Sequence, residues 1–302
     1  MKRLFVFFMA LASSPVYSGI YRHDTDPEKY KKMAQQQEFA CVGEVFEDYS
    51  GAPIGSCVLI GNRYVLSAAH CFIKGDNVID TQYVVNGQKI TTYKQINIAP
   101  GEASDYTFRF NHKRYAGNRL VIHPEYLANT REGRCDIVLI ELKDTVDGIH
   151  PAAINSVFDE LNVLATGVGY GVSGRADKPE EVDIYMEKIA GQNRIDSIGG
   201  HVISNRPTVL MADFDHPEIK EWNKMGSPEP VELEYAVGGG DSGGPLFRQT
   251  NQRWELIGIC SGGGVAVADF ITKGYYSQVS QWTRVSVFYD WIENTIRDMQ
   301  KM

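Results

Sequence analysis

Between residues 40 and 285, short apolar runs rich in β-branched residues alternate with clusters of Gly, Asn, Asp and Pro. The runs include SCVLIGNRYVLSAA, DIVLIEL, NVLATGVGYG and WELIGIC. Runs of this length between turn-forming residues are typical of β-strands. Since no long segment of helical periodicity interrupts them, the pattern predicts an all-β sandwich or barrel rather than an alternating α/β sheet.

Helical periodicity is confined to the two ends of this region. Near the C-terminus, the apolar residues of VSVFYDWIENTIRDMQKM predict a helix over residues 286–299 that docks on the β core. Near the N-terminus, DTDPEKYKKMAQQQEF predicts a short helix, because Asp26 is a suitable N-cap and Pro27 suits the first turn. The polar tracts around 74–118 and 173–230 are expected to form extended surface loops.

The first residues have the pattern of an export signal. A basic start, MKR, precedes the apolar run LFVFFMALA, and Val16 and Ser18 then stand at positions −3 and −1 of a signal-peptidase site. The pattern predicts that residues 1–18 are a signal peptide and that the protein is secreted, to the extracellular space or the periplasm. No other window approaches the roughly 20 apolar residues of a spanning helix, so no membrane partner is expected.

Composition narrows the class of protein further. A chain of 302 residues with 43% hydrophobic content can build one large domain or two small ones. The net charge of −8, with no stripe of Lys and Arg, argues against a nucleic-acid partner. Five cysteines suit an oxidising compartment, and the odd number leaves at least one outside any intrachain pair. No CxxC or HExxH motif is present, so no metal is expected.

The segment YAVGGGDSGGPLF surrounds one Asp-Ser pair with glycines. Glycine carries an entropic cost that a special backbone path or the close approach of a ligand would justify, as around a nucleophilic Ser242. Gly240–Gly244 also fits the G-x-S-x-G elbow of α/β hydrolases. That fold needs a histidine after the serine, and the last histidine here is His216, so the hydrolase elbow is excluded.

A base and an orienting acid for this serine stand upstream. YVLSAAHCF places His70 directly after a β-rich run, and CDIVLIEL places Asp136 at the head of an apolar strand, where a buried carboxylate can hold a histidine in one tautomer. Asp144 and Asp147 are alternatives for the acid, but only Asp136 begins the apolar run. The chain order is therefore His, Asp, Ser.

The segments LSAAHC, DIVLIEL and GDSGGP resemble the three signature segments of the chymotrypsin/trypsin-like serine proteases. The resemblance covers residues 40–297, and VIHPEY, GYG, CSGGG and TRVSVFYDWI follow in the family's order. It implies two antiparallel six-stranded β-barrels, at about 40–150 and 151–285, with a C-terminal helix. It also implies a secreted serine endopeptidase that acts on polypeptides as a monomer without a cofactor, with an activating protease or an inhibitor as further partners.

The resemblance assigns roles to single residues. Ser242 would be the nucleophile, His70 its base and Asp136 the acid that orients the imidazole. The main-chain amides of Gly240 and Ser242 would form the oxyanion hole, where each donor contributes about 3 kcal/mol. Ser261 resembles the serine that donates a hydrogen bond to the carboxylate of the triad.

The residues of the substrate pocket suggest its preference. Ala236 stands six residues before Ser242, where trypsin-like members have an Asp that selects Arg or Lys. Ser261, Gly263 and Ser280 match other pocket positions. Without a buried acid, a cationic side chain would lose its partner on entry, so an uncharged P1 residue is expected. Glu234 is the alternative acid, if a loop shift brings it into the pocket.

The cysteines depart from the family's pattern. The usual partner of the cysteine beside the base falls on Gly55, whereas Cys57 lies two residues later. A bridge between Cys57 and Cys71 is the expectation, and it would contribute about 2–4 kcal/mol. The cysteine that usually precedes the nucleophile is Gly238, so the bridge that flanks the pocket is missing.

The activation segment departs from the family as well. Members are usually activated when a new N-terminus pairs with the acid before the nucleophile, here Asp241, but no IVGG segment exists. Removal of the leader would expose Gly19, and one further trim would expose Ile20. We expect this end, or an internal group such as Arg22, to pair with Asp241, which makes 19–39 an N-terminal activation segment.

A second hypothesis follows from these departures. A catalytically silent homologue that serves as a binding or regulatory module would need neither the activation segment nor the usual cysteines. The presence of all three catalytic side chains and both oxyanion positions favours the enzyme.

Overall fold

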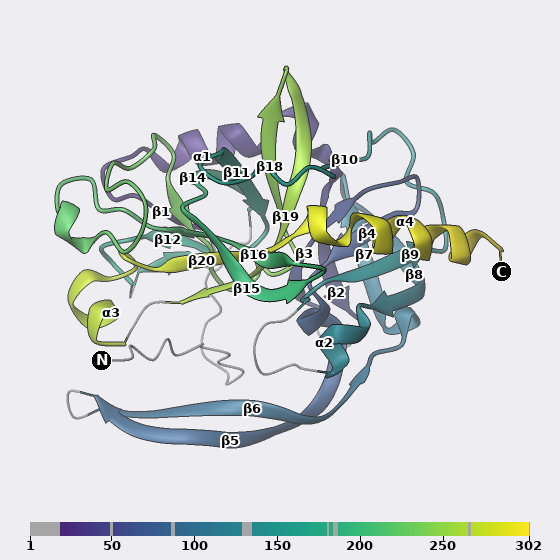
Figure 1. Cartoon of the computed structure of the whole chain (residues 1–302), viewed down its shortest axis with the longest axis horizontal. Coiled ribbons are helices and arrows are strands. Elements are labelled where there is room, and N and C mark those ends of the chain that lie inside the picture. Colours follow the sequence, from purple (N-terminus) through teal and green to yellow (C-terminus); the bar gives the residue numbers. More distant parts are fainter. Residues whose placement is uncertain are drawn as a thin grey trace.

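The computed structural model describes residues 19–48, 51–85, 88–128, 135–179, 181–183, 187–264 and 267–301. The predicted signal peptide lies outside these ranges. Two curved β-sheets lie side by side, and a long helix extends from their junction toward the C-terminus (Figure 1). The all-β fold that the sequence predicted is confirmed. Among the described helices, none is both long and apolar enough to cross a membrane.

The first sheet is a closed barrel of six antiparallel strands. In spatial order these are β2 (Val42–Glu47), β3 (Pro53–Leu59), β4 (Tyr64–Ser67), β9 (Val138–Leu142), β8 (Lys113–Ile122) and β7 (Tyr106–Phe110). In β7, buried Tyr106, Phe108 and Phe110 alternate with more exposed Thr107 and Arg109, as expected for a strand with one face on the core. The polar tract at 74–118, expected as a loop, therefore contains two strands of this barrel.

The second sheet has eight strands instead of the six that were expected. Its path is β14 (Ile189–Arg194), β11 (Leu164–Gly169), β18 (Pro245–Thr250), β19 (Arg253–Gly264), β20 (Val279–Arg284), β16 (Arg206–Asp213) and β15 (Ser197–Ile203), with β10 (Ala153–Ile154) beside β19. The first and last strands of this path, β14 and β15, are consecutive in the chain and are separated only by Ile195 and Asp196. There, Ile195 N donates to Val163 O and Asp196 N donates to Met211 O, both at 3.0 Å. These bonds curve the sheet into a second barrel.

The N-terminal segment packs on the second barrel. Here β1 (Ile20–Tyr21) lies between β12 (Ser173–Arg175) and β17 (Tyr235–Ala236), with β13 (Val182–Asp183) beyond β12. The predicted short helix is α1 (Pro27–Ala34), where the Asp26 carboxylate accepts a hydrogen bond from Glu28 N at 3.0 Å. Because Ile20 is fully buried, this strand is part of the folded protein.

A long ribbon follows β4 and one short 3-10 helix in the chain. It consists of β5 (Ile73–Val85) and β6 (Gln88–Pro100), which pair only with each other and lie apart from both sheets (Figure 1). The ribbon starts directly after the 3-10 helix η2 (Ala69–Phe72). Its root is closed by a bond from Gly101 N to Phe72 O at 2.7 Å.

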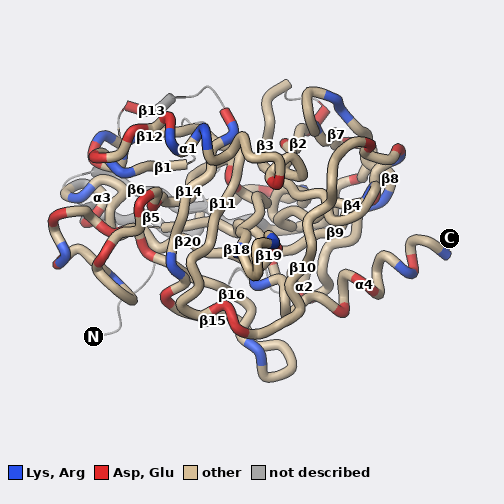
Figure 2. Tube along the Cα trace, turned by 90° about the horizontal axis from the view of Figure 1, so that it is seen from above, with Lys and Arg blue, Asp and Glu red and all other residues tan. Residues whose placement is uncertain are grey.

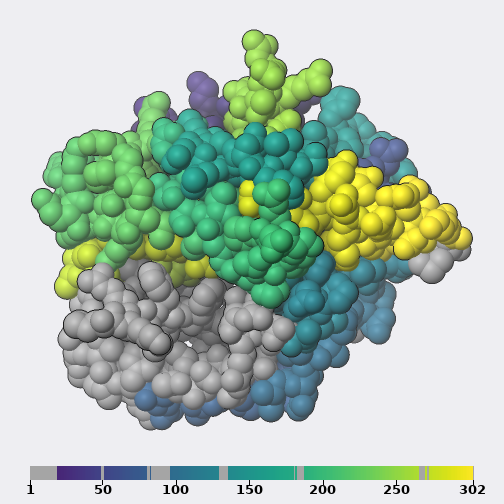
Figure 3. All heavy atoms as spheres, viewed as in Figure 1, coloured from purple at the N-terminus to yellow at the C-terminus, as the bar shows by residue number. Residues whose placement is uncertain are grey.

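The helices lie outside the barrels. The predicted C-terminal helix is α4 (Val285–Lys301), which buries Val285, Phe288, Ile292 and Met299 in a hydrophobic core to which strands of both barrels contribute. Its atoms adjoin those of β15 and β16 on the surface (Figure 3). Two short helices are α2 (Pro124–Ala128) and α3 (Val267–Lys273). Acidic and basic positions are interspersed around the periphery and along α4 (Figure 2).

Candidate active site

His70 and Asp136 meet at the edge of the first barrel. His70 lies in η2, directly after β4, and Asp136 lies just before β9, which pairs with β4. His70 N donates to Asp136 Oδ1 at 2.9 Å, and His70 Nδ1 lies 2.7 Å from Asp136 Oδ2. With an ionised carboxylate, Nδ1 carries the proton of the neutral ring, and Nε2 keeps a lone pair.

The second barrel also holds Asp136. Ser261 Oγ, on β19, donates to Asp136 Oδ2 at 2.7 Å, as the resemblance suggested. Thr283 Oγ1, on β20, donates to the main-chain O of Asp136 at 2.9 Å. Thr283 begins the segment TRVSVFYDWI, but no role had been assigned to it from the sequence. Asp136 belongs to the first barrel and is only 2% exposed. It accepts hydrogen bonds from residues of both barrels.

The two groups shift each other's pKa in opposite directions. Burial lowers the pKa of His70, but the Asp136 carboxylate and the nearby Cys71 thiol outweigh it, so the pKa of His70 is raised. Burial alone would raise the pKa of Asp136, but His70, with its hydrogen bond and that of Ser261, lowers it. Asp136 therefore stays ionised beside a strengthened base.

The loop that carries Ser242 needs glycine at two positions. Gly240 has φ +92° and Gly243 has φ +83°, in the left-handed region that favours glycine. A Cβ on Gly243 would collide with Ser67 Oγ and lie 2.9 Å from Ala68 N. Ser242 O accepts a bond from Ser56 N at 2.8 Å. The serine loop is thus pressed against the segment that ends in His70.

Ser56 has a second contact with this loop, which sequence reasoning missed. Its Oγ donates to Gly240 O at 2.8 Å and accepts from Tyr170 N at 2.9 Å. The hydroxyl therefore fixes the peptide plane that follows Gly240. No motif marks this serine, because its role depends on the packing of the two barrels.

Asp241 is buried and receives main-chain donors. Its Oδ2 accepts from Gly19 N at 2.9 Å and from Gly238 N at 3.2 Å. Arg22 points elsewhere, to Asp24 at 2.6 Å and to Val231 O at 2.7 Å. Of the groups considered for Asp241, the structure brings Gly19 N to it and not Arg22.

The expected bridge between Cys57 and Cys71 is not formed, and both side chains are thiols. A Cβ at Gly55 would lie 3.1 Å from Cys71 Sγ, so this sulfur faces Gly55. Cys57 is two residues further along β3, about 7 Å away along the strand, and fully buried. The expectation was wrong because a position two residues away along a strand cannot replace the missing partner.

The pocket residues lie together at one end of the second barrel. Ala236 is fully buried and pairs with Ile20, and Ser280 pairs with Gly263 across β19 and β20. Ser280 Oγ accepts a bond from Val237 N at 3.2 Å.

Glu234, the alternative pocket acid, points away from this group. Its carboxylate accepts from Asp215 N at 3.0 Å and from Val231 N at 2.7 Å. Burial raises the pKa of Glu234 to about 9, against these two bonds. A neutral acid held in this way supplies no negative charge to a pocket.

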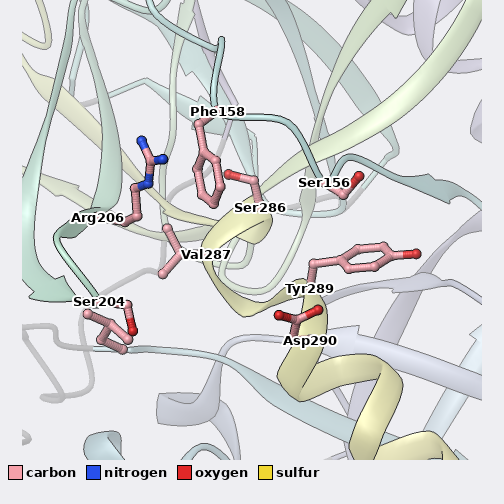
Figure 4. A pocket seen from close by; sticks show the side chains of 9 residues that line it. Ser156, Phe158, Ser204, Arg206, Ser286, Val287, Tyr289 and Asp290 are labelled. Atoms are coloured by element: carbon pink, nitrogen blue, oxygen red, sulfur yellow. The ribbon is translucent and has the colours of Figure 1, made fainter.

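A separate cavity of about 410 Å³ lies at the start of α4 (Figure 4). Phe158, Arg206 and Asp290 line it, and no histidine does. Ser286 Oγ, also in its lining, donates to Glu160 at 2.5 Å. Because this cavity has no histidine that could act as a base for one of its serines, the cluster around His70 is the stronger candidate for an active site.

Comparisons with known proteins agree with this geometry. The family model for trypsin matches residues 31–292. Melanization protease 1 of Drosophila melanogaster is 25% identical over 79% of this chain and 57% of its own length. CLIP domain-containing serine protease B14 of Anopheles gambiae is 26% identical over 76% of this chain and 62% of its own length. The chain thus spans less than two thirds of these relatives.

A solved structure supports the fold. Neuropsin, a serine protease expressed in the limbic system of mouse brain, superposes with a TM-score of 0.55 over 86% of this chain and 95% of its own, at 18% identity. The matched range, residues 31–292, covers most of the chain and includes His70, Asp136 and Ser242. The chain therefore belongs to the trypsin-like serine protease family.

Proposed function

We propose that this chain is a serine endopeptidase in which Ser242, His70 and Asp136 hydrolyse peptide bonds. The observation that carries the proposal is the double contact of Asp136 with His70, at 2.9 Å to the main chain and 2.7 Å to the ring. It leaves Nε2 free to take a proton. Polypeptides are the substrates that the family implies.

Acylation uses the strengthened base. His70 Nε2 takes the hydroxyl proton of Ser242 as Oγ attacks the scissile carbonyl carbon. The imidazolium then gives this proton to the leaving amine as the C–N bond breaks. Asp136 stabilises the imidazolium and remains ionised. In deacylation, His70 takes a proton from water as the water oxygen attacks the ester carbonyl, and the imidazolium then gives this proton to Ser242 Oγ as the C–O bond breaks.

The amides of Gly240 and Ser242 stabilise the oxyanion that forms in both steps. The left-handed φ of Gly240 and the bond from Ser56 to its carbonyl support this role, because they hold the loop in one conformation before substrate binds. No step of the mechanism uses a metal or an organic cofactor.

The pocket formed by Ala236, Ser261, Gly263 and Ser280 favours an uncharged P1 residue. The neutral state and position of Glu234 support this preference, because a buried Arg or Lys would find no counter-charge there.

Activation would follow removal of the signal peptide after Ser18. Gly19 N lies 2.9 Å from Asp241, so cleavage at this bond would turn a neutral amide into an ammonium group that pairs with the carboxylate. The mature protein is then a secreted monomer that needs no second cleavage. Mass spectrometry of the active protein checks this, since an N-terminus well beyond Gly19 would contradict it.

Labelling with a fluorophosphonate probe tests the proposed function. The wild-type protein should be labelled, and Ser242→Ala should lose the label. Ser156→Ala, in the cavity at α4, is the matched control and should be labelled like wild type. A folded protein with Gly19 at its N-terminus that takes no label would instead favour a catalytically silent homologue that acts as a binding or regulatory module.

A further inference from the structure

Two side chains that the sequence analysis did not mark lie in the specificity pocket, defined here as the space bounded by Ala236, Gly263 and Ser280. A Cβ added to Gly263 would lie 2.8 Å from Gln278 Nε2 and 2.9 Å from Val237 Cγ2. Contacts this short mean that both side chains rest directly on the backbone of Gly263. The wall of the pocket is therefore covered.

Gln278 is held firmly in this position. Its Nε2 donates to Val237 O at 2.5 Å, and the residue is 5% exposed. Its own N donates to Tyr275 O at 3.1 Å, and its O accepts from Phe214 N at 2.9 Å. The main-chain bonds fix the backbone of Gln278, and its side chain cannot swing away without leaving the carbonyl of buried Val237 without this donor.

The main chain of Val237 is hydrogen-bonded to both Ser280 and Gln278. Its N donates to Ser280 Oγ at 3.2 Å, while its O accepts from Gln278. The segment before Ser242 is thereby tied to β20. By contrast, a Cβ on Gly262 would meet no atom within 4 Å, so the neighbouring part of β19 is open.

We infer that Gln278, together with Val237, determines the substrate specificity of this protein by leaving room only for a small P1 side chain, that of Gly, Ala or Ser. The inference rests on the proposed function and narrows its preference for uncharged residues. A Leu, Phe or Arg side chain would have to displace the amide of Gln278 and break its bond to Val237 O. A methyl or hydroxymethyl group requires no such displacement.

Peptide substrates that differ only in P1 test this inference on the mature protein. Wild type should cleave after Ala at least about tenfold more efficiently, in kcat/KM, than after Leu or Phe. Gln278→Ala should raise the Phe-to-Ala ratio of kcat/KM by about tenfold or more, because truncation opens the pocket. Gln249→Ala, an exposed change on β18, should leave the ratio as in wild type.

Fluorophosphonate labelling separates the outcomes. If labelled wild type cleaves after Phe or Leu as well as after Ala, the inference is overturned. It is also overturned if Gln278→Ala is labelled but keeps the wild-type ratio. If Gln278→Ala fails to fold and takes no label, the P1 profile of wild type decides alone. Wild type that neither labels nor cleaves overturns the proposed function, and the inference with it.

Discussion

Buried carboxylates in the two halves of the molecule behave in opposite ways. At the junction of the barrels, the pKa of Asp136 is lowered, since His70 and Ser261 more than offset its burial. In the second half, four acids lie close together, namely Asp196, Asp213, Asp215 and Glu234. Burial raises the pKa of Asp196 to about 7, that of Asp215 to about 6 and that of Glu234 to about 9.

The pKa values shift in opposite directions because the hydrogen-bond donors around these carboxylates differ in charge. Asp136 is paired with a group that can carry positive charge. In the acidic cluster, Asp213 accepts from the main-chain N of Lys224 and Met225, and Asp215 accepts from the Asn223 amide. Dipoles alone do not offset the loss of hydration of several neighbouring carboxylates. A buried acid with a lowered pKa and buried acids with raised pKa values therefore coexist in one small protein.

The largest expected effect comes from breaking the charged pair. Asp136→Asn keeps the shape of the side chain but favours the wrong tautomer of His70, so kcat should fall about 10⁴-fold, as in the family template. Steady-state kinetics on an Ala-P1 peptide measures this. Asp144→Asn, an exposed change, should keep wild-type kcat. Equal losses in both variants would contradict the assignment of the acid.

The second prediction contrasts activity with stability as pH rises. Activity needs neutral His70, whose pKa is raised, so kcat/KM should increase with pH through that pKa. Stability should change in the opposite sense. The folded state holds protons on Asp196, Asp215 and Glu234 that the unfolded chain releases near pH 4.

Between pH 5 and 9 the folded state therefore binds more protons, and the free energy of unfolding should fall by several kcal/mol, most of it from Glu234, whose pKa is raised furthest. Urea denaturation at pH 5, 7 and 9 measures the slope. A free energy of unfolding that rises over this range would show that these acids are ionised in the folded state.

A smaller effect is expected from Ser261→Ala, which removes one donor from Asp136. Loss of a hydrogen bond to a charged group costs about 1.5–3 kcal/mol, and part of this should appear as a roughly tenfold lower kcat with little change in KM. Because the mutation raises the pKa of Asp136, the pH profile should change as well. A change in KM alone would point to a role in substrate binding.

The smallest effect tests the acidic cluster. Asp196 Oδ2 accepts from Asp213 N at 3.3 Å, and Asp213 Oδ1 is buried without a partner within the described part of the chain. In Asp196→Asn, the amide can donate to Asp213 without a shared proton. The fall in stability from pH 5 to 9 should become about 1 kcal/mol smaller. An unchanged slope would place the proton uptake on Asp215 and Glu234.

Sequence patterns predicted the elements with strong local signals. The helices α1 and α4 follow from a cap, a proline and an apolar stripe, and the β-rich runs became strands of the two barrels. The prediction of a loop at 74–118 was wrong, because polar residues of this tract belong to strands. Two of the five residues of β7, Thr107 and Arg109, are polar and only partly buried, so its tract resembled a loop.

Only the tertiary structure could decide contacts between distant segments. The family and the residues of the expected triad follow from short motifs, because nucleophile, base and acid each need a particular local backbone. The partner of Asp241, the direction of Cys71 Sγ and the role of Ser56 depend on loops that meet across the barrels.

Gln278 makes the same point for the specificity pocket. It lies 41 residues along the chain from Val237, and its amide binds Val237 O beside Gly263. Although Ser280 nearby was predicted to line the pocket, no motif assigned a role to Gln278. The sequence by itself determined the family, the strand-rich fold and the residues available for chemistry, since these depend on local patterns. What fills the pocket and which buried acids stay neutral were decided by packing, since desolvation and hydrogen bonding depend on every segment that surrounds a group.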